Sequence, residues 1–483
     1  MFQAQSTTAR PLRRTTWLTR SRFPAVALNS IADGYDNYVR GLVNAGFTGL
    51  VWAPEVRYST CDADFARRVQ LMFLGTMAQF NAWQHGDTPM DCAGPVWDGF
   101  VRHHHLRARL LPYLYTAAHA QSATGMPILR PLLLQFPADR GTRKIVDQWL
   151  LGPVRARAST SFGALSAPCP SAAMRSTALP RVGDAAWCLQ SDVVTNTGSP
   201  CVWDADWCLQ SDVGTNSPPQ DLLVAPAGVG STTGKADTLA RDIYFPGPRR
   251  SQLWYSYWNA SVATADRGGT TRTVPTPVNF APLFVRGGAV VAMLSAQQHH
   301  RQAGSAAEEA AEDGDSAAKG ADSAVTAERG AEGAGRAQRQ EGAGLHVIVA
   351  LSHPETGTAA GTLFIDDGVS VHPGDGAHPT APTLLVSFEA GTRRLVSTPA
   401  TPGGGVLSPD DAAFPTVVDS VAVFGVGVGI TELRLSTLGP SGAPVHTRVI
   451  PASQYTWDEA TGVLEVSRLR QTLTAPWALE WTI

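Results

Sequence analysis

The chain has 483 residues, of which 43% are hydrophobic and 16% are charged, and its formal net charge is −3. This length exceeds one ordinary domain, so we expect two to four structural units. The small net charge gives no electrostatic reason for nucleic acid or an anionic membrane as partner, and no apolar run is long enough to predict a membrane-spanning helix. The composition favours a neutral or weakly charged substrate.

The first 153 residues alternate between helical and strand patterns. The predicted helices cover 31–46, 63–82, 98–123 and about 142–150, and the predicted strands cover 48–52 and 128–134. Alternating strands and helices indicate a parallel α/β architecture, and four such units make half of an eightfold barrel. We therefore predict part of a (β/α)8 TIM barrel over 1–153, with the residues just after Trp52 at the C-terminal end of a strand.

The sequence from residue 221 onward predicts a different fold class. Short apolar segments alternate with Gly and Pro turns over 221–296 and again over 345–483, a pattern typical of β-sandwich domains. Between them, residues 297–344 consist mainly of Ala, Gly, Glu and Arg, with few bulky apolar side chains. Such a segment cannot offset the entropy of ordering, and we predict a disordered linker or loop insertion there.

Residues 154–220 contain a tandem duplication, because WCLQSDV occurs at 187–193 and again at 207–213. Two copies are too few for a solenoid. We interpret the segment as an irregular, poorly folded insertion, with a small disulfide-linked knot as the alternative. Four of the six cysteines lie here, but the chain has no C-x-x-C pair, so no zinc site is predicted and no disulfide is implied.

Eight short motifs follow one another in an order that carries a resemblance to a known family. They are LRARLLPYLY (106–115), GMPILRPL (125–132), DQWLLGP (147–153), DLLVAP (221–226), YFP (244–246), WYSYW (254–258), PLFVRGG (282–288) and DDG (366–368). The series resembles glycoside hydrolase family 31, the family of α-glucosidases and related α-glycosidases. The resemblance implies the C-terminal half of a TIM barrel followed by proximal and distal β-sandwiches. It also implies a carbohydrate substrate, retaining hydrolysis of α-glucosides, and neither cofactor nor metal.

The resemblance also marks two discontinuities. In the family, the equivalent of 147–153 runs directly into that of 221–226, so 154–220 either loops out between two strands or is sequence that the working protein lacks. The family's nucleophilic Asp lies in a W-x-D-M-N-E-like motif, which does not occur in these residues. The chain is therefore expected to be a C-terminal portion with a truncated N-terminus. No signal peptide is visible, and the compartment stays open.

Retaining hydrolysis needs two carboxyl groups about 5–5.5 Å apart. The resemblance makes Arg20 a substrate-binding residue and places the acid/base near Leu28, Asn29 or Ser30, none of which is a carboxylate. Asp33 and Asp36 are close, and a shortened loop would bring either into place; Asp33 is the candidate for the acid/base. The alternative for Asp33 is an acidic residue at a helix N-terminus, where the helix dipole favours it.

The remaining predicted sugar-binding residues also follow from the resemblance. Glu55 stands where the family has an Asp that accepts hydrogen bonds from sugar hydroxyls, and Arg57 follows it; a Glu55–Arg57 surface ion pair is the alternative. Gln79 and Asn81 stand where the family has an Arg and a His that contact the sugar. Amides still pair with hydroxyls, and Trp83 is expected to stack on a sugar ring.

Other polar motifs are given non-catalytic interpretations. His85 and Asp87 are assigned to a rim loop. Adjacent side chains on a helix diverge by about 100°, so the histidines at 103–105 predict a solvated helix start and no metal site. The sequence Asn259-Ala-Ser261 is a glycosylation sequon in a predicted turn, which has meaning only in a secreted protein.

Three functional hypotheses remain open at this point. The first is a retaining α-glycosidase that is incomplete as given. The second is a non-catalytic carbohydrate-binding or degenerate relative, motivated by the amides at Asn29, Gln79 and Asn81. The third is a truncated, non-functional product, because half a barrel leaves strand edges unpaired.

Overall fold

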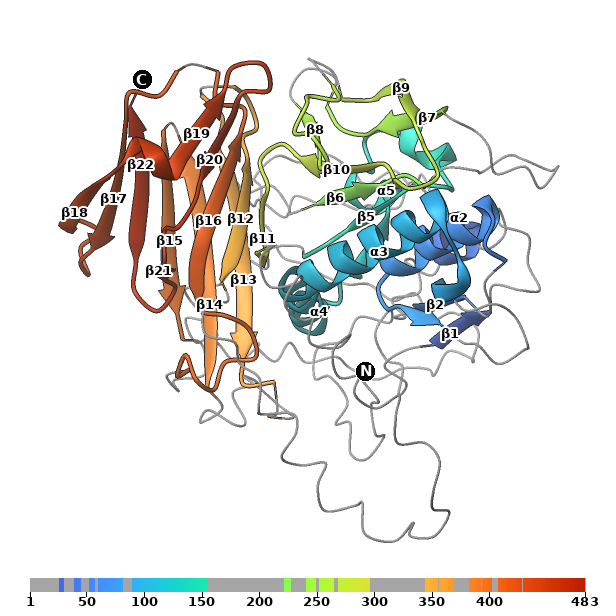
Figure 1. Cartoon of the computed structure of the whole chain (residues 1–483), viewed down its shortest axis with the longest axis horizontal. Helices are drawn as coiled ribbons and strands as arrows, with labels where there is room; N and C mark the ends of the chain where they lie inside the picture. Colours follow the sequence, from blue (N-terminus) through green and yellow to red (C-terminus); the bar gives the residue numbers. More distant parts are fainter. Residues whose placement is uncertain are drawn as a thin grey trace, which may run out of the picture. The chain divides into compact units, whose positions relative to one another are not determined.

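The computed structural model is mostly sheet with few helices (Figure 1). It describes residues 26–29, 39–44, 52–56, 60–80, 89–153, 221–226, 240–248, 252–264, 268–295, 344–354, 356–368, 370, 382–391, 393–401, 407–427 and 429–482. The chain divides into a unit of 1–156 with 216–483 and a second unit of 157–215, and all described residues belong to the first. Within them, no helix is both long and apolar enough to span a bilayer.

Three parallel strands form the N-terminal sheet, in the order β1 (Val26–Asn29), β2 (Trp52–Val56) and β3 (Gln79–Phe80). A helix at 39–44 separates β1 from β2 in sequence, and α2 (Ala63–Phe73) separates β2 from β3. Parallel neighbours require such crossovers. The alternation of strand and helix predicted for this region is thus present, whereas Ala53 to Val56, expected beyond the strand, lie inside β2.

The helices in this region are shorter than the periodicity predicts. The Asp62 carboxylate accepts from the Phe65 amide 2.8 Å away and caps α2, but α2 ends at Phe73 and β3 occupies part of the predicted helix over 63–82. The predicted helix over 98–123 is two helices, α3 (Gly94–Arg109) and α4 (Leu111–Thr124). Pro112 has no N–H to donate within a continuous helix, so the chain restarts at its position.

A five-stranded antiparallel sheet follows. Its order is β4 (Leu129–Pro131), β5 (Trp149–Leu151), β6 (Leu222–Val224), β10 (Leu283–Arg286) and β8 (Trp254–Ser256). The short helix α5 (Leu132–Gln135) and a 3-10 helix (Arg140–Lys144) connect β4 to β5. β5 and β6 are direct antiparallel neighbours although 154–220 separates them in sequence. This pairing confirms that the DQWLLGP and DLLVAP motifs form adjacent strands.

The prediction of a fourth barrel unit from a strand at 128–134 and a helix around 142–150 is wrong. β4 pairs antiparallel with β5 and does not join the parallel sheet, and residues 149–151 form a strand. Trp149, Leu150 and Leu151 are all fully buried, which a strand covered on both faces achieves without helical periodicity. Strands before residue 153 therefore pair with strands after it.

β7 (Ala240–Phe245) and β9 (Thr270–Pro275) form a separate two-stranded sheet. Ile243 and Phe245 of β7 share a core cluster with Trp254 of β8 and Phe284 of β10. The ring centroids of Phe245 and Phe284 lie 4.8 Å apart, edge to face. This cluster joins the two-stranded sheet to one face of the five-stranded sheet.

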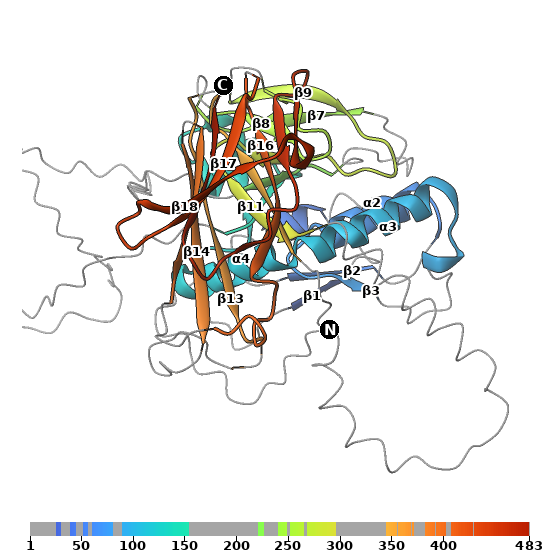
Figure 2. The ribbon, with the colours of Figure 1, turned by 60° about the vertical axis from the view of Figure 1, so that its left-hand side comes forward.

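Two six-stranded sheets make up the C-terminal region (Figures 1 and 2). The first contains β11 (Val290–Leu294), β12 (Leu345–Ala350), β16 (Val417–Phe424), β20 (Val463–Val466) and β19 (Tyr455–Asp458), with β21 (Gln471–Thr472) beside β16. The second contains β13 (Ala359–Asp366), β14 (Thr383–Gly391), β15 (Arg394–Ala400), β22 (Trp477–Thr482), β17 (Glu432–Leu438) and β18 (Pro444–Ile450). Both sheets contribute to one apolar core, with Val349 and Val421 from the first and Phe388 and Trp477 from the second.

Candidate active site

The parallel sheet brings together three positions that the sequence analysis associates with sugar binding or catalysis. Asn29 of β1 is the register partner of Glu55 in β2, and Glu55 is the register partner of Gln79 in β3. Asn29 is the last residue of β1, and Glu55 is the penultimate residue of β2. The C-terminal ends of parallel barrel strands are where catalytic and binding residues gather, so this row marks the candidate site.

The other predicted site residues lie outside the described part of the chain. These are Arg20, Asp33, Arg57, Asn81 and Trp83, together with the rim-loop pair His85 and Asp87. Of the predicted set, the structure places Glu55 and Gln79 and brings them into adjacent backbone positions. The roles assigned to all these residues stay predictions.

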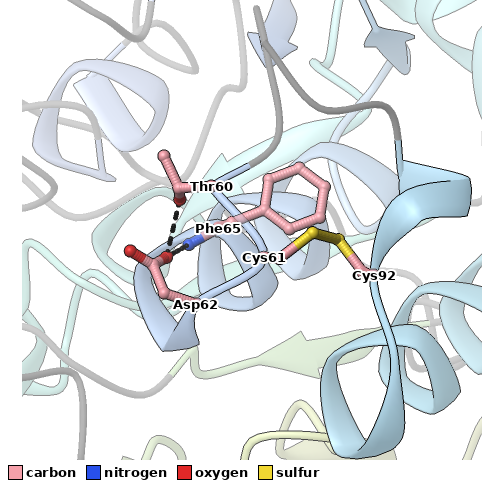
Figure 3. Close-up of a disulfide and its surroundings, with 5 residues drawn as sticks. All are labelled: Thr60, Cys61, Asp62, Phe65 and Cys92. Atoms are coloured by element: carbon pink, nitrogen blue, oxygen red, sulfur yellow. Dashed lines mark hydrogen bonds between the residues drawn. A yellow bond between two sulfur atoms is a disulfide. The ribbon is translucent and has the colours of Figure 1, made fainter.

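A disulfide between Cys61 and Cys92 lies beside this sheet (Figure 3). It joins the residue before the Asp62 cap of α2 to the residue after a 3-10 helix (Pro89–Asp91), with the two Cα atoms 5.1 Å apart. The bond closes a loop that includes β3 and the segment carrying Asn81 and Trp83. No local pattern in the sequence marks this pair, because six cysteines allow many pairings.

Apolar side chains surround the disulfide and tie it to the candidate site. Cys92 is 7% exposed and shares a cluster with Phe65 of α2 and Val56 of β2, against which Cys61 also packs. Figure 3 shows Phe65 between the Asp62 cap and the disulfide. Because Val56 adjoins Glu55, the packing around the disulfide reaches the strand end that carries the candidate site.

Two residues from the ordered motifs hold the turn that leads from α2 into β3. The Arg107 guanidinium donates to the carbonyl oxygens of Phe73, Gly75 and Thr76, the last at 2.7 Å. The indole N–H of Trp149 donates to the Leu74 oxygen 3.2 Å away. Burial lowers the pKa of Arg107 to about 10, still far above neutral pH, so the guanidinium stays charged. Sequence reasoning missed both contacts to this turn.

The three adjacent histidines do not form a solvated helix start, so that prediction is wrong. They lie in the middle of α3, where His103 is fully buried. Its Nδ1–H donates to the Gly99 oxygen at 2.6 Å, and its Nε2 accepts from the Ala281 amide at 3.1 Å. The Nδ1 bond stays within α3, and the Nε2 bond joins α3 to the segment before β10. Burial lowers the pKa of His103 to about 4.

Among the described residues, no group of three or more His, Cys, Asp or Glu side chains is placed to hold a metal ion. The three residues in register at the strand ends are Glu55, whose side chain is a carboxylate, and Asn29 and Gln79, whose side chains are amides. Carboxylates and amides together offer the donors and acceptors that pair with sugar hydroxyls.

Comparison with known proteins relates this architecture to carbohydrate-active enzymes. Residues 219–291 match the glycosyl hydrolase family 31 C-terminal domain. An alpha-glucosidase of Aspergillus oryzae is 22% identical over 379 residues, which cover 78% of this chain and 24% of that enzyme. The chain thus spans about a quarter of the length of this relative.

Solved structures share the fold at lower sequence identity. A crystal structure of glucosidase II alpha subunit superposes with a TM-score of 0.56 at 17% identity, covering 91% of this chain and 35% of that chain. The family 31 dextranase of Flavobacterium johnsoniae gives a TM-score of 0.53 at 15% identity, covering 93% and 42%. The family-model match is thus to glycoside hydrolase family 31 over residues 219–291, and the solved structures show a shared fold.

Proposed function

We propose that the chain is part of an α-glucosidase-type glycoside hydrolase that cleaves O-glycosyl bonds of α-glucosides with retention. The observation that carries the proposal is the row Asn29–Glu55–Gln79 at the ends of three parallel strands. The family 31 match over 219–291 and the similarity to an alpha-glucosidase of Aspergillus oryzae support the same chemistry. A carbohydrate is accordingly the proposed substrate.

The proposal includes an assignment of domains. The three parallel strands belong to the partial barrel of 1–153. β6, β8 and β10 with β7 and β9 form the proximal β-sandwich of 221–296, and β4 and β5 from before residue 153 extend its sheet. The strands from β12 onward form the distal β-sandwich of 345–483, to which β11 pairs. The segments 154–220 and 297–344 are an insertion and a linker. The extensive antiparallel pairing in the C-terminal region supports the sandwich assignment.

In the proposed mechanism, one carboxylate attacks the anomeric carbon while a second carboxyl group protonates the departing glycosidic oxygen. Glu55 accepts hydrogen bonds from sugar hydroxyls, and Gln79 with Asn81 supplies paired amide donors and acceptors. Arg20 and Arg57 bind the substrate and Trp83 stacks on it. Asp33 is the proposed acid/base, and a W-x-D-M-N-E-like strand of the family supplies the nucleophile.

The experiment is turnover of a chromogenic α-glucoside by the chain alone and by the chain joined to family barrel strands carrying the W-x-D-M-N-E-like motif. We expect turnover only in the joined protein. In that protein Glu55→Gln should lower kcat/KM about tenfold or more, because a charge-assisted hydrogen bond is lost. Glu459→Gln, an exposed position beyond β19, is the matched control. Turnover by the chain alone would overturn the division of catalytic groups.

A second candidate function is carbohydrate binding without hydrolysis. Asn29 and Gln79 present amides in the candidate row, and an amide binds hydroxyls but cannot supply the proton of a general acid. Calorimetric titration with maltose separates the two functions. Binding that persists in the joined protein without any turnover would favour the second function over the first.

A further inference from the structure

The sequon Asn259-Ala-Ser261 lies in the turn that follows β8. It is the one N-x-S/T sequence with a residue other than Pro in the middle that the chain contains. The Asn259 side chain is exposed, whereas the neighbouring Tyr255 and Ala260 are buried. We propose that Asn259 is an N-glycosylation site and that the chain matures in the secretory pathway.

The geometry of the turn leaves the reactive nitrogen of Asn259 available. Its Oδ1 accepts from the Ser261 hydroxyl at 2.8 Å and from the Ser261 amide at 3.3 Å. Among the described residues, no group accepts a hydrogen bond from Asn259 Nδ2. The carboxamide is therefore oriented through its oxygen, and Nδ2, the atom that carries an N-linked glycan, stays free.

Main-chain hydrogen bonds also hold the turn. The Ala260 amide donates to the Ser256 oxygen, and the Ser256 amide donates to the Ser261 oxygen, each at 2.8 Å. Ala260 has a φ of 55°, in the left-handed region, which closes the turn tightly. A glycan on Asn259 consequently requires no rearrangement of the backbone.

A pocket lined by aromatic and polar side chains lies beside Asn259. Asn259 lines a pocket of about 630 Å³ together with Tyr257 and Trp258 from its own turn and polar residues such as Thr456 and Asp458 from β19. Aromatic rings with neighbouring polar groups suit the apolar faces and hydroxyls of a sugar. The first sugar residues of a glycan have room here without displacing a packed side chain.

The Cys61–Cys92 disulfide supplies a second, independent observation on the compartment. Structural disulfides form and persist in oxidising environments such as the ER lumen and the extracellular space, and they are rare in the cytosol. N-linked glycans are added in that same oxidising route. The sequon lies in the turn after β8, whereas the disulfide joins the residue before the α2 cap to the residue after the 3-10 helix at Pro89–Asp91, so neither observation depends on the other.

The modification is a glycosyl transfer whose co-reactant is an oligosaccharide linked to a lipid diphosphate. A bond forms between Asn259 Nδ2 and the anomeric carbon of the first sugar. The bond from that carbon to the diphosphate oxygen breaks, the lipid diphosphate leaves with the electron pair, and Nδ2 loses one proton. The Ser261 hydroxyl that holds Oδ1 in place is the group that the sequon requires.

The test is expression of the full chain behind a cleavable secretory leader in a eukaryotic host, followed by peptide mapping with and without peptide N-glycosidase. We expect one modified site, at Asn259, and a single mobility shift on deglycosylation. Asn259→Gln and Ser261→Ala should each abolish the shift, while Ser261→Thr, which keeps a hydroxyl, should retain it. The non-reducing map should show Cys61 linked to Cys92.

Two outcomes overturn the proposal. One is an unmodified Asn259 in folded, secreted wild-type chain. The other is the recovery of Cys61 and Cys92 as free thiols from that secreted chain. Neither outcome depends on glycosidase turnover, so failure here is separate from failure of the proposed catalytic function.

Discussion

Arg130 of β4 forms a buried ion pair with Asp221, which precedes β6, with 2.5 Å between Nη2 and Oδ1. The two side chains are 1% and 0% exposed. The second oxygen of Asp221 accepts from Arg286 Nη1 at 2.7 Å, and Arg286 stands over the ring of Phe136. One carboxylate therefore joins the GMPILRPL, DLLVAP and PLFVRGG motifs, which lie far apart in sequence.

Replacing this carboxylate should be among the most damaging single changes in the chain. Asp221→Asn leaves two buried guanidinium groups without their shared counter-charge, and we expect a loss of about 3–5 kcal/mol in the free energy of unfolding. The matched control is Glu432→Gln, which breaks the exposed ion pair with Arg434 and should cost below about 1 kcal/mol. Urea denaturation measures both, and equal losses would contradict the argument.

The DDG motif has a structural role that can be measured in the same way. The Tyr115 hydroxyl of α4 donates to Asp366 Oδ2 at 2.7 Å, and the other oxygen of Asp366 accepts from the Gly368 amide at 2.9 Å. Because Asp366 is 1% exposed, Tyr115→Phe should cost about 1.5–3 kcal/mol. This interaction connects α4 to the end of β13.

The control for Tyr115→Phe is the same truncation at Tyr257. The hydroxyl of Tyr257 contacts the Met293 sulfur at 3.7 Å, and sulfur is a weak acceptor. Tyr257→Phe should therefore cost clearly less than Tyr115→Phe in urea denaturation. A larger loss at Tyr257 would show that the carboxylate of Asp366 does not set the energy of the Tyr115 contact.

Much of the fold follows from local sequence pattern. The alternation of strand and helix before residue 80, and the adjacency of the 147–153 and 221–226 strands, are confirmed. Apolar content alone does not distinguish helix from strand in a short buried run, which is why the predicted helix over about 142–150 overlaps the start of β5. Pro112 is a local signal for the break between α3 and α4, because it lacks an N–H. The continuous apolar stripe of 106–115 nevertheless favoured one unbroken helix in the prediction.

The candidate site was partly predictable from family resemblance, whereas much of the fold was predictable from local pattern. Glu55 and Gln79 were found from family resemblance, and the parallel register supplies their adjacency. Arg107 and Trp149 were missed, because their contacts to main-chain oxygens after α2 depend on tertiary packing that no local pattern records. The same limit applies to the Cys61–Cys92 disulfide, because the pairing depends on how close the two residues lie in the folded chain.

Burial of His103 predicts a loss of stability in acid. Burial lowers the pKa of His103 to about 4, and the nearby Arg102 and Arg67 lower it further against the raising effect of the Gly99 hydrogen bond. As the pH falls from about 6.5 to 4, the unfolded chain binds a proton that the folded chain does not, so stability decreases with falling pH. The single-site contribution is on the order of 3 kcal/mol.

Denaturation at a series of pH values tests this contribution. His103→Gln removes the titrating ring, so the variant should show a flatter dependence of unfolding free energy on pH between about 6.5 and 4. His346, whose pKa burial also lowers to about 4, remains in both proteins and keeps part of the slope. Identical slopes for wild type and variant would mean that His103 does not stay neutral in the folded chain.

Loss of the disulfide should loosen the candidate site more than the rest of the chain. Replacing Cys61 and Cys92 together by Ser opens a loop whose ends are 31 residues apart, and closing such a loop stabilises by about 2–4 kcal/mol. Because the loop contains β3, we expect faster amide exchange over 60–80 in the double variant. The strands β12 to β17, which have their own core, should exchange at unchanged rates. Wild-type chain treated with a thiol reductant should reproduce the pattern, and uniform acceleration across both regions would show that the disulfide acts globally.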